Sequence, residues 1–313
     1  MKNMRVAAVR LALAAIVGMA AGCAFLQKPI WPPSVQSLPE RHELADVPFF
    51  AQEEYQCGPA AMAMALQRSG LRVTPAELTD KVYTPSLHGS LQPALVAAAR
   101  RLGRVAYVIS TGDALFREVA AGYPVIVLQN LGLSWFPVWH YAVVIGYDIP
   151  AEDVLLHSGT DERLRTDWRV FTATWARADD WGLLVLRPDE LPATAEESAY
   201  VEAVVGVERA GSLQAAVTGY ETALSRWPQD LTALMGLGNS SYAVGDMTRA
   251  ESAFRRAAQA HPRSGAAWNN LADVLLRLGR KAEALEAAQA AVALGGPQAA
   301  TFQKTLDEIR SAP

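Results

Sequence analysis

The chain of 313 residues has few cysteines and no run of basic residues. Its two cysteines, Cys23 and Cys57, lie in unrelated sequence contexts, so we expect no disulfide framework. A net charge of -4 without basic runs argues against a nucleic-acid partner. The five histidines show no paired spacing with cysteines or carboxylates, and no glycine-rich phosphate loop is present. We therefore expect neither a metal site nor a cofactor.

The N-terminal segment has the order of an export signal. Three basic residues precede an apolar stretch at 11–21, which is too short to remain as a membrane-spanning helix. Small residues then lead to Cys23. The sequence Ala20-Ala-Gly-Cys23 resembles the site at which bacterial lipoproteins are cut and lipidated, although Ala20 stands where leucine is usual. Cleavage as an ordinary secreted protein, without a lipid, is the competing interpretation.

We therefore expect residues 1–22 to be a lipoprotein signal peptide, Cys23 to carry the lipid, and residues 23–42 to form a proline-containing tether. Ala24 stands where an aspartate would indicate retention at the inner membrane, so we expect a periplasm-facing protein anchored at the outer membrane of a bacterial cell envelope. The lipid would be its one attachment to the membrane, because no later apolar run is long enough to span a bilayer.

The composition changes along the rest of the chain. Residues 43–188 mix short β-branched runs with glycine and proline, whereas residues 197–313 are rich in alanine and leucine and have a helical period. An acidic, proline-containing joint leads into residues 189–196, which we interpret as a linker. This pattern predicts an α+β domain with an antiparallel sheet, followed by an all-α domain.

The second part repeats at an interval of 34 residues, at which Gly211, Gly245 and Gly279 share one phase. Small or aromatic residues keep the same interval in three further sets: Ala216, Ala250, Ala284; Tyr220, Phe254, Ala288; and Ala223, Ala257, Ala291. The period and pattern resemble the tetratricopeptide repeat, in which pairs of helices stack into a solenoid. We expect three such repeats over 197–313, with a surface that binds a protein partner. An unrelated helical bundle is the alternative.

Cys57 stands at the start of a predicted helix. Residues 58–68 have a helical pattern, with Pro59 near the start and Gly70 at the end. A thiol at a helix N-terminus is expected to have a lowered pKa, because backbone N–H groups and the macrodipole stabilise the thiolate. Cys57 is therefore a candidate nucleophile. A buried apolar cysteine without chemistry is the alternative.

His140 opens a strand-like run at 139–148. A cysteine at a helix start and a histidine at the start of a distant strand form the papain-like arrangement, in which the histidine accepts the thiol proton. Gln52, five residues before the cysteine, can donate to the oxyanion of a tetrahedral intermediate beside the Cys57 N–H. Gln56 is a competing donor.

Three features carry a resemblance to a known family: Gln52, the run Cys57-Gly-Pro-Ala60, and the run from His140 to Asp148. On these features, residues 43–188 resemble the papain-like peptidases that remove double-glycine leaders from bacteriocins, and their stand-alone relatives. The resemblance implies that Cys57 is the nucleophile, that His140 is the general base and then the acid, and that Gln52 is the oxyanion donor.

The third catalytic position departs from that family, which places an aspartate at the end of the next strand to orient the histidine. Here the strand at 153–157 ends without a carboxylate, and His157 or Ser158 occupies the position. Asp161 lies slightly beyond and could fold back, whereas we interpret Asp148 as a turn residue.

Other elements follow from local signals. Thr74-Pro-Ala-Glu77 is a capping box for a helix, and Ser90 is expected to cap the helix that follows it. Five tryptophans after residue 130 either line a groove beside the site or pack in the core. They are Trp135, Trp139, Trp168, Trp175 and Trp181. Further helices are predicted at 75–82, 90–101 and 113–121, and strands at 105–110, 124–129 and 182–187.

These features predict an exported, lipid-anchored cysteine peptidase that acts on a peptide or protein substrate, with the repeats recruiting the substrate or a partner. The missing aspartate favours an alternative, a catalytically weak or inactive peptide-binding module that serves as a scaffold in an envelope assembly. Acyl or amide transfer through the same thioester is a third possibility.

Overall fold

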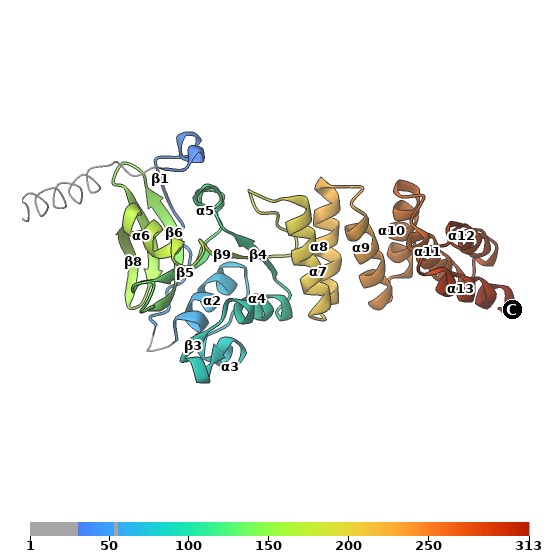
Figure 1. The fold of residues 1–313 in the computed structure, drawn as a ribbon, viewed down its shortest axis with the longest axis horizontal. Coiled ribbons are helices and arrows are strands. Elements are labelled where there is room, and N and C mark those ends of the chain that lie inside the picture. The colour runs from blue at the N-terminus through green and yellow to red at the C-terminus, as the bar shows by residue number, and fades with distance from the viewer. Residues whose placement is uncertain (1–30, 53–55, 313) are drawn as a thin grey trace, which may run out of the picture. The chain divides into compact units, whose positions relative to one another are not determined.

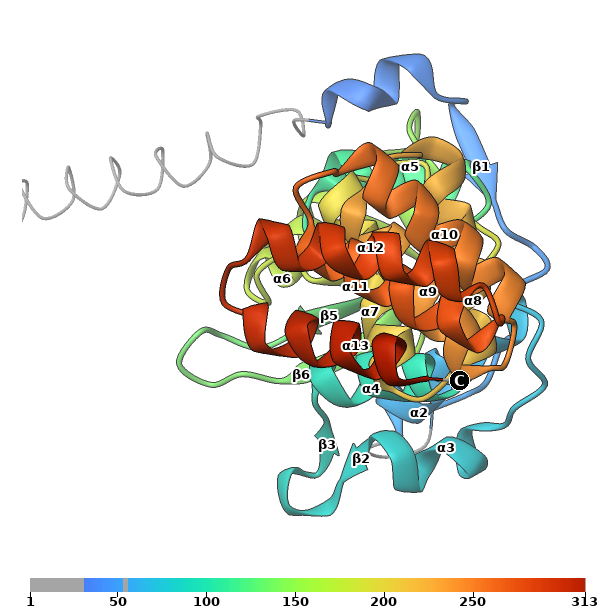
Figure 2. The ribbon, with the colours of Figure 1, turned by 90° about the vertical axis from the view of Figure 1, so that its right-hand side faces the viewer.

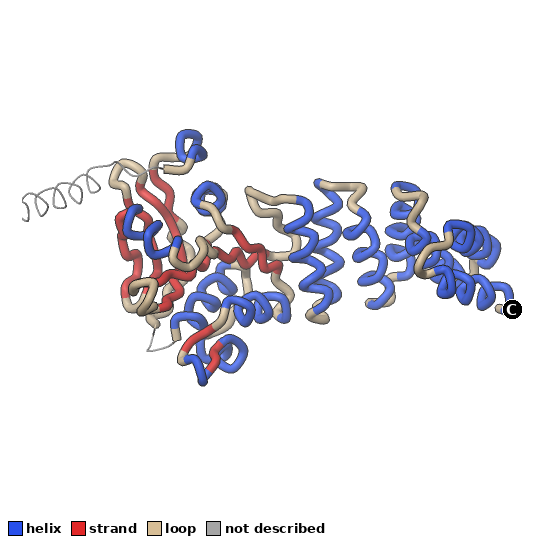
Figure 3. Tube along the Cα trace, viewed as in Figure 1, coloured by secondary structure: helices blue, strands red, loops and turns tan. Residues whose placement is uncertain are grey.

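The computed structural model describes residues 31–52 and 56–312. The first part combines strands and helices, and the second contains helices alone (Figure 3). The predicted signal peptide and Cys23 lie outside the described residues. Within the described part, no helix is both long and apolar enough to cross a membrane.

The described strands of the first part form one seven-stranded antiparallel sheet in the order β4-β9-β5-β6-β7-β8, with β1 also paired to β6 (Figure 1). Its strands are β1 (Arg41–Glu43), β4 (Val105–Ile109), β5 (Val125–Asn130), β6 (Trp139–Asp148), β7 (Asp153–Ser158), β8 (Asp161–Asp167) and β9 (Gly182–Leu186). Two short strands, β2 (Tyr83–Thr84) and β3 (Gly89–Ser90), pair separately.

Helices cover both faces of the sheet (Figure 1). On one face α2 (Cys57–Arg68) and α4 (Gln92–Arg101) pack on the central strands, and α3 (Pro75–Val82) packs against both helices. On the other face lie α5 (Gly112–Ala120) and α6 (Trp168–Ala176). The middle strands are therefore buried on both sides, which explains their continuous apolar sequences.

The elements predicted for the first part are confirmed within one or two residues, but three features differ. Ser90 does not cap α4: it lies in β3, and Leu91 precedes the helix without a side-chain cap. Residues 41–42, which we expected in the tether, belong to β1. The edge strand β8 was not predicted, because its sequence is charged and largely exposed on both faces.

Two of the tryptophans pack in the core, as one of the two interpretations expected, and two others are exposed. Trp168 and Trp175 are buried around Phe171, with ring centroids 5.6 and 5.5 Å from it. Trp135 and Trp139 are exposed. The cluster after residue 130 therefore contributes to the core through α6 and to the surface through the β5–β6 connection.

The second part contains three antiparallel helix pairs and a further helix (Figure 2). The glycine between the helices of each pair, Gly211, Gly245 and Gly279, has a positive φ of 83°, 87° and 75°. Glycine adopts this backbone conformation readily, which allows the sharp turn between the two helices. The pairs are α7 (Glu197–Arg209) with α8 (Leu213–Arg226), α9 (Leu231–Ala243) with α10 (Met247–Ala260), and α11 (Gly265–Arg277) with α12 (Lys281–Leu294), followed by α13 (Ala299–Ser311).

The predicted linker is held against the first part by hydrogen bonds. The buried Glu118 carboxylate on α5 accepts from the N–H groups of Ala193 and Thr194, at 3.0 and 2.7 Å, and from the Thr194 hydroxyl. The Tyr107 hydroxyl on β4 donates to the Thr194 carbonyl and accepts from the Glu196 N–H. The segment 189–196 is therefore a fixed connection.

Candidate active site

Cys57 is the first residue of α2, and this helix packs on β6. The Cys57 sulfur therefore lies at a helix N-terminus, as predicted. Gln56 stands at the cap position without a side-chain cap, and Pro59 lies in the first turn, where its missing N–H is harmless. Residues 53–56 separate Cys57 from Gln52, the residue predicted to donate to the oxyanion.

Gly58 allows a close approach of β3 to the start of α2. A Cβ at position 58 would lie 2.3 Å from Ser90 Oγ and 2.5 Å from Ser90 Cβ. The Ser90 hydroxyl is buried beside this glycine and has no hydrogen-bond partner among the described residues. The glycine after the cysteine is therefore required by packing.

The electrostatic surroundings correct one expectation. Burial raises the pKa of the Cys57 thiol, and the N–H groups of Tyr141, Gly58 and Cys57 itself lower it by less. The helix N-terminus is present, but desolvation outweighs it. The expected lowered pKa is therefore wrong for this structure, and the neutral thiol is the favoured form.

The backbone of Tyr141 connects Cys57 to Gln52. Its N–H lowers the pKa of the Cys57 thiol, and its carbonyl accepts from Gln52 Nε2 at 3.2 Å. The other end of the Gln52 amide is also fixed, because Oε1 accepts from the Gly159 N–H at 3.1 Å. These two bonds set the orientation of the buried amide.

Gln56, the competing donor, is occupied elsewhere. Its Oε1 accepts from the Thr79 hydroxyl on α3 at 3.1 Å. Of the two glutamines, Gln52 is the one that shares a backbone partner with Cys57.

His140 meets Ser158. Its Nε2 lies 2.9 Å from Ser158 Oγ. The register explains the contact: Val143 on β6 pairs with His157 on β7, so Ser158 faces the same side of the sheet as Ala142 and His140. Burial lowers the pKa of His140, which favours its neutral form.

His157 points to the opposite face and does not meet His140. Its buried ring bonds through Nε2 to the Val47 carbonyl at 3.2 Å, and its Nδ1 accepts from the Arg163 N–H at 3.4 Å. Phe49 packs on it with a centroid distance of 5.2 Å. Of the two candidates for the third position, the structure thus places Ser158, and not His157, behind His140.

Neither nearby aspartate takes that position. Asp161 starts β8 and its side chain is exposed. Asp148 is eight residues from His140 on the same strand, roughly 26 Å away. It accepts from Arg41, Arg165 and the Ala151 N–H, and the Arg165 bond contributes most to lowering its pKa.

No hydrogen bond joins the Cys57 thiol to the His140 ring in the described part of the chain. Cys57 is on α2, which packs on β6, and His140 is the second residue of β6. A raised thiol pKa and a lowered imidazole pKa both favour the neutral pair over a thiolate–imidazolium pair.

An apolar hairpin precedes His140. Residues 131–138 carry no charge and connect β5 to β6 as a projecting loop (Figure 2). Trp135 and Phe136 at its tip are 81 and 72% exposed. Asn130 Oδ1 holds its base by accepting from the Gly132 and Val138 N–H groups at 3.0 and 2.9 Å. The apolar side chains are thus presented on an ordered loop next to the candidate base.

Among the residues that the structure describes, no three histidine, cysteine or acidic side chains are grouped closely enough to hold a metal ion. The chemistry that the arrangement supports is therefore built from a thiol, an imidazole, a hydroxyl and amide donors.

Comparison with known proteins identifies both parts of the chain. Residues 44–181 match the family model of the peptidase C39-like family. The chain has a C39-like domain. Tetratricopeptide-repeat models match residues 208–262 and 237–299, so this domain is followed by tetratricopeptide repeats, as predicted. The comparison with curated proteins found no match.

Several solved structures are similar in fold to one of the two parts. A protein described as a C39-like peptidase from Bacillus anthracis is 19% identical, with a TM-score of 0.41; the match covers 47% of this chain and 98% of that one. PcrH from Pseudomonas aeruginosa is 18% identical, with a TM-score of 0.35, over 37% and 92%. The Yersinia enterocolitica type III secretion chaperone SycD, in complex with a YopD peptide, is 18% identical, with a TM-score of 0.34, over 36% and 91%.

Sequence reasoning missed two contributors to the C39-like domain's site. The Tyr141 backbone touches both Cys57 and Gln52, but backbone groups carry no sequence signal. Ser90 is distant in sequence, and only the close approach at Gly58 reveals its place. A glycine directly after a candidate nucleophile is the one signal that could have suggested a neighbouring chain.

Proposed function

We propose that this protein is a cysteine peptidase that hydrolyses a peptide bond through a thioester on Cys57. The observation that carries the proposal is the set of contacts around the start of β6: Cys57 and Gln52 share the Tyr141 backbone, and His140 is held by Ser158. The match to the C39-like family supports the reaction class.

In the proposed reaction, His140 accepts the thiol proton as Cys57 sulfur attacks the carbonyl carbon. Because both groups are favoured in their neutral forms, this transfer accompanies the attack. For Nδ1 to accept the proton, Nε2 must carry the other hydrogen and donate it to Ser158 Oγ. Gln52 Nε2 and the Cys57 N–H are the proposed donors to the oxyanion.

The intermediate then collapses: the carbon–nitrogen bond breaks, His140 gives its proton to the leaving amine, and the acyl group remains on Cys57. Water attacks the thioester, His140 takes a proton from the water, and the carboxylic acid leaves as the thiol is restored. The exposed hairpin beside His140 is suited to contact apolar residues of the substrate.

We further propose that the protein is exported and attached to the bacterial envelope by a lipid on Cys23, facing the periplasm at the outer membrane. The tetratricopeptide repeats would recruit the substrate or a protein partner, because stacked helix pairs present an extended binding surface. This attachment rests on the leader sequence.

A catalytically weak peptide-binding module is the second candidate. The observation that favours it is Ser158, since a hydroxyl stabilises an imidazolium less than a carboxylate does. Incubating a peptide pool with the wild-type chain and with Cys57→Ala, followed by mass spectrometry, separates the two. Products that need Cys57 support the peptidase, and identical spectra from both chains contradict it.

A further inference from the structure

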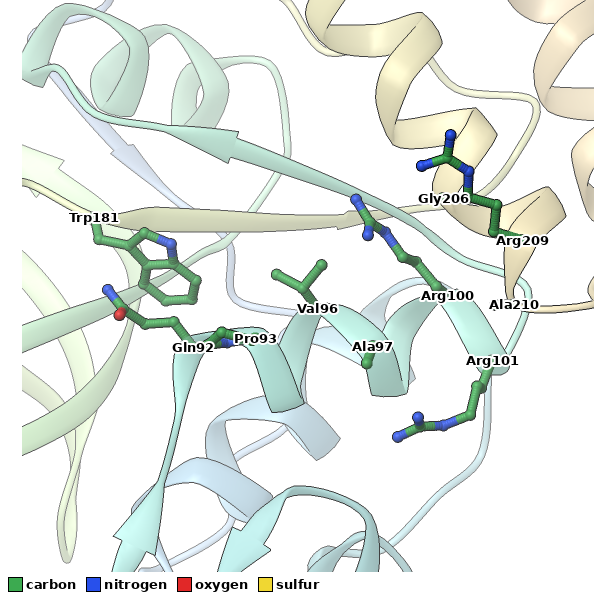
Figure 4. Close-up of a pocket in the computed structure, with 10 residues that line it drawn as sticks. All are labelled: Gln92, Pro93, Val96, Ala97, Arg100, Arg101, Trp181, Gly206, Arg209 and Ala210. Carbon is green, nitrogen blue, oxygen red and sulfur yellow. The ribbon is translucent and has the colours of Figure 1, made fainter.

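A cavity of about 680 Å³ lies between α4 and α7 (Figure 4). Trp181 and Gln92 lie at one end of it, and arginines lie at the other. The stretch of α4 between these ends presents apolar side chains, including Val96 and Ala97. The C39-like domain and the first repeat thus build this cavity together.

The basic end carries positive charge without acidic partners. Arg100 and Arg101 come from α4 and Arg209 comes from α7, and none of the described residues that line the cavity is acidic. None of the three arginines forms an ion pair with a described carboxylate. An anionic group entering the cavity would therefore meet guanidinium groups that are free to bind it.

Arg100 is held in place by packing. A Cβ at position 206 would lie 2.3 Å from Arg100 Nε and 2.4 Å from Cζ, so the guanidinium rests directly on Gly206. Arg100 Nε is buried and has no acceptor among the described residues. A buried guanidinium N–H without a partner is unfavourable, which makes an acceptor supplied by a ligand favourable.

Arginine in the last turn of a helix is also favoured by the macrodipole, which accounts for positive charge at the end of α4. It does not account for a buried Nε directed at a glycine of another helix. The apolar stretch of the cavity adds a second requirement, because a small anion alone would leave it in contact with water.

The other end of the cavity lies close to the candidate active site. The Trp181 ring packs edge-on against Tyr141, with centroids 6.0 Å apart, and Trp181 and Cys57 pack against the same buried cluster, which contains Tyr141. A chain bound along α4 would therefore be directed towards Cys57.

We propose that this cavity binds a peptide segment with a carboxylate at Arg100 and apolar side chains along Val96 and Trp181. If the bound peptide is the substrate, the cavity assigns that substrate an apolar segment that ends in a carboxylate. This part of the proposal rests on the proposed peptidase function. Binding itself does not require cleavage. The carboxylate is that of a chain terminus or of an acidic side chain, which share the same chemistry.

The test uses the full chain with Cys57→Ala, so that no peptide is consumed. A short fluorescein-labelled peptide of leucine, alanine and glycine is prepared as the free acid, as the C-terminal amide, and as an amide with glutamate at the last position. Anisotropy measures the Kd of each. We expect a carboxylate form to bind about tenfold more tightly than the plain amide, as for a charge-assisted hydrogen bond. Tighter binding of the free acid alone would identify a chain-terminal carboxylate as the group that is bound. Tighter binding of both acids would show that a terminal or a side-chain carboxylate can be bound.

Arg100→Gln and the exposed Arg209→Gln should each reduce this preference, whereas Arg263→Gln, which removes an exposed arginine outside the cavity, should keep it. Thermal unfolding checks that the variants are folded. If Arg100→Gln does not fold, Arg209→Gln still tests the cavity. Equal binding of all three peptides, or a preference unchanged in both cavity variants, overturns the proposal. Cleavage by the wild-type chain is measured separately, so failure of the cavity leaves the peptidase result intact.

Discussion

His140 Nε2 lies 2.9 Å from Ser158 Oγ, so a hydroxyl stands where related peptidases are expected to place a carboxylate. The hydroxyl can hold the imidazole in one tautomer and orientation. It cannot supply the negative charge that would stabilise an imidazolium. Burial of the ring, and not this contact, lowers the pKa of His140.

Replacing Ser158 distinguishes two effects of the residue behind His140: orientation of the imidazole and stabilisation of its positive charge. Ser158→Ala should lower kcat about threefold to tenfold, because it removes one hydrogen bond to the base. Ser158→Asp should raise both kcat and the pKa of the acid limb, because a carboxylate favours the imidazolium. The measurement is the pH profile of kcat/KM.

The matched control is His157→Ala. It should leave the pH profile unchanged but lower the free energy of unfolding by about 1–3 kcal/mol, because the Val47 carbonyl and the Arg163 N–H lose their partner. If Ser158→Ala lowers only stability and His157→Ala lowers only activity, the assignment of the third position is reversed.

Cys57 should react with alkylating reagents as a neutral thiol does. Burial raises its pKa, so labelling by iodoacetamide should be slow at pH 6 and rise only above about pH 8.5. His140→Ala should change the labelling profile little, because no ion pair is favoured in the free chain. A plateau of fast labelling below pH 7 that His140→Ala removes would show instead that the pair is charged.

Gln52→Ala should lower kcat by about a hundredfold with a smaller change in KM, because the amide is proposed to donate to an oxyanion that forms only during the reaction. Gln56→Ala removes the neighbouring glutamine, which is bonded to Thr79, and should leave kcat nearly unchanged. Initial rates on a cleaved peptide measure both variants. Equal losses in the two variants would remove the distinction between them.

Local sequence signals predicted most of the fold because the helices and strands of this chain agree with their own propensities. The capping box at Thr74 and Glu77 forms as expected, and the glycines of the repeats adopt positive φ. Candidate residues for the site could be named from the sequence, but the strand register that brings them together could not be predicted. Whether His157 or Ser158 meets His140 depends on which residue of β7 pairs with Val143, and a shift of one residue would reverse the answer.

The pKa of the Cys57 thiol could not be predicted from the sequence for a different reason. A helix N-terminus is visible in the sequence and favours the thiolate, but burial of the sulfur depends on chain segments distant from Cys57. The cavity at Arg100 was likewise not predictable, because it needs Gly206 from another helix. Long-range burial, and not local pattern, decides both features.

Gly58→Ala should destabilise the domain by about 1–3 kcal/mol, because its methyl group would overlap Ser90. The double variant Gly58→Ala, Ser90→Gly should recover most of the loss, since it removes the atoms that collide. Urea unfolding of the two single variants and the double variant measures the coupling. Additive losses would show that the two positions do not press on each other.

Glu118 should make stability depend on pH. Burial raises the pKa of its carboxyl, against the hydrogen bonds from Thr194 and Ala193, which lower it. The folded chain therefore binds a proton more readily than the unfolded chain at this site. Its contribution to stability is present below the usual carboxyl range and is lost as the pH rises through the raised pKa.

Glu118→Gln should remove this part of the slope, which begins near the usual carboxyl pKa and extends to higher pH, as measured by urea unfolding at a series of pH values. Glu202→Gln, at an exposed position on α7, should keep the wild-type slope. A slope unchanged in Glu118→Gln would mean that the carboxylate is stabilised by its three hydrogen bonds more than burial destabilises it. The connection between the C39-like domain and the repeats would then be held by a charged group.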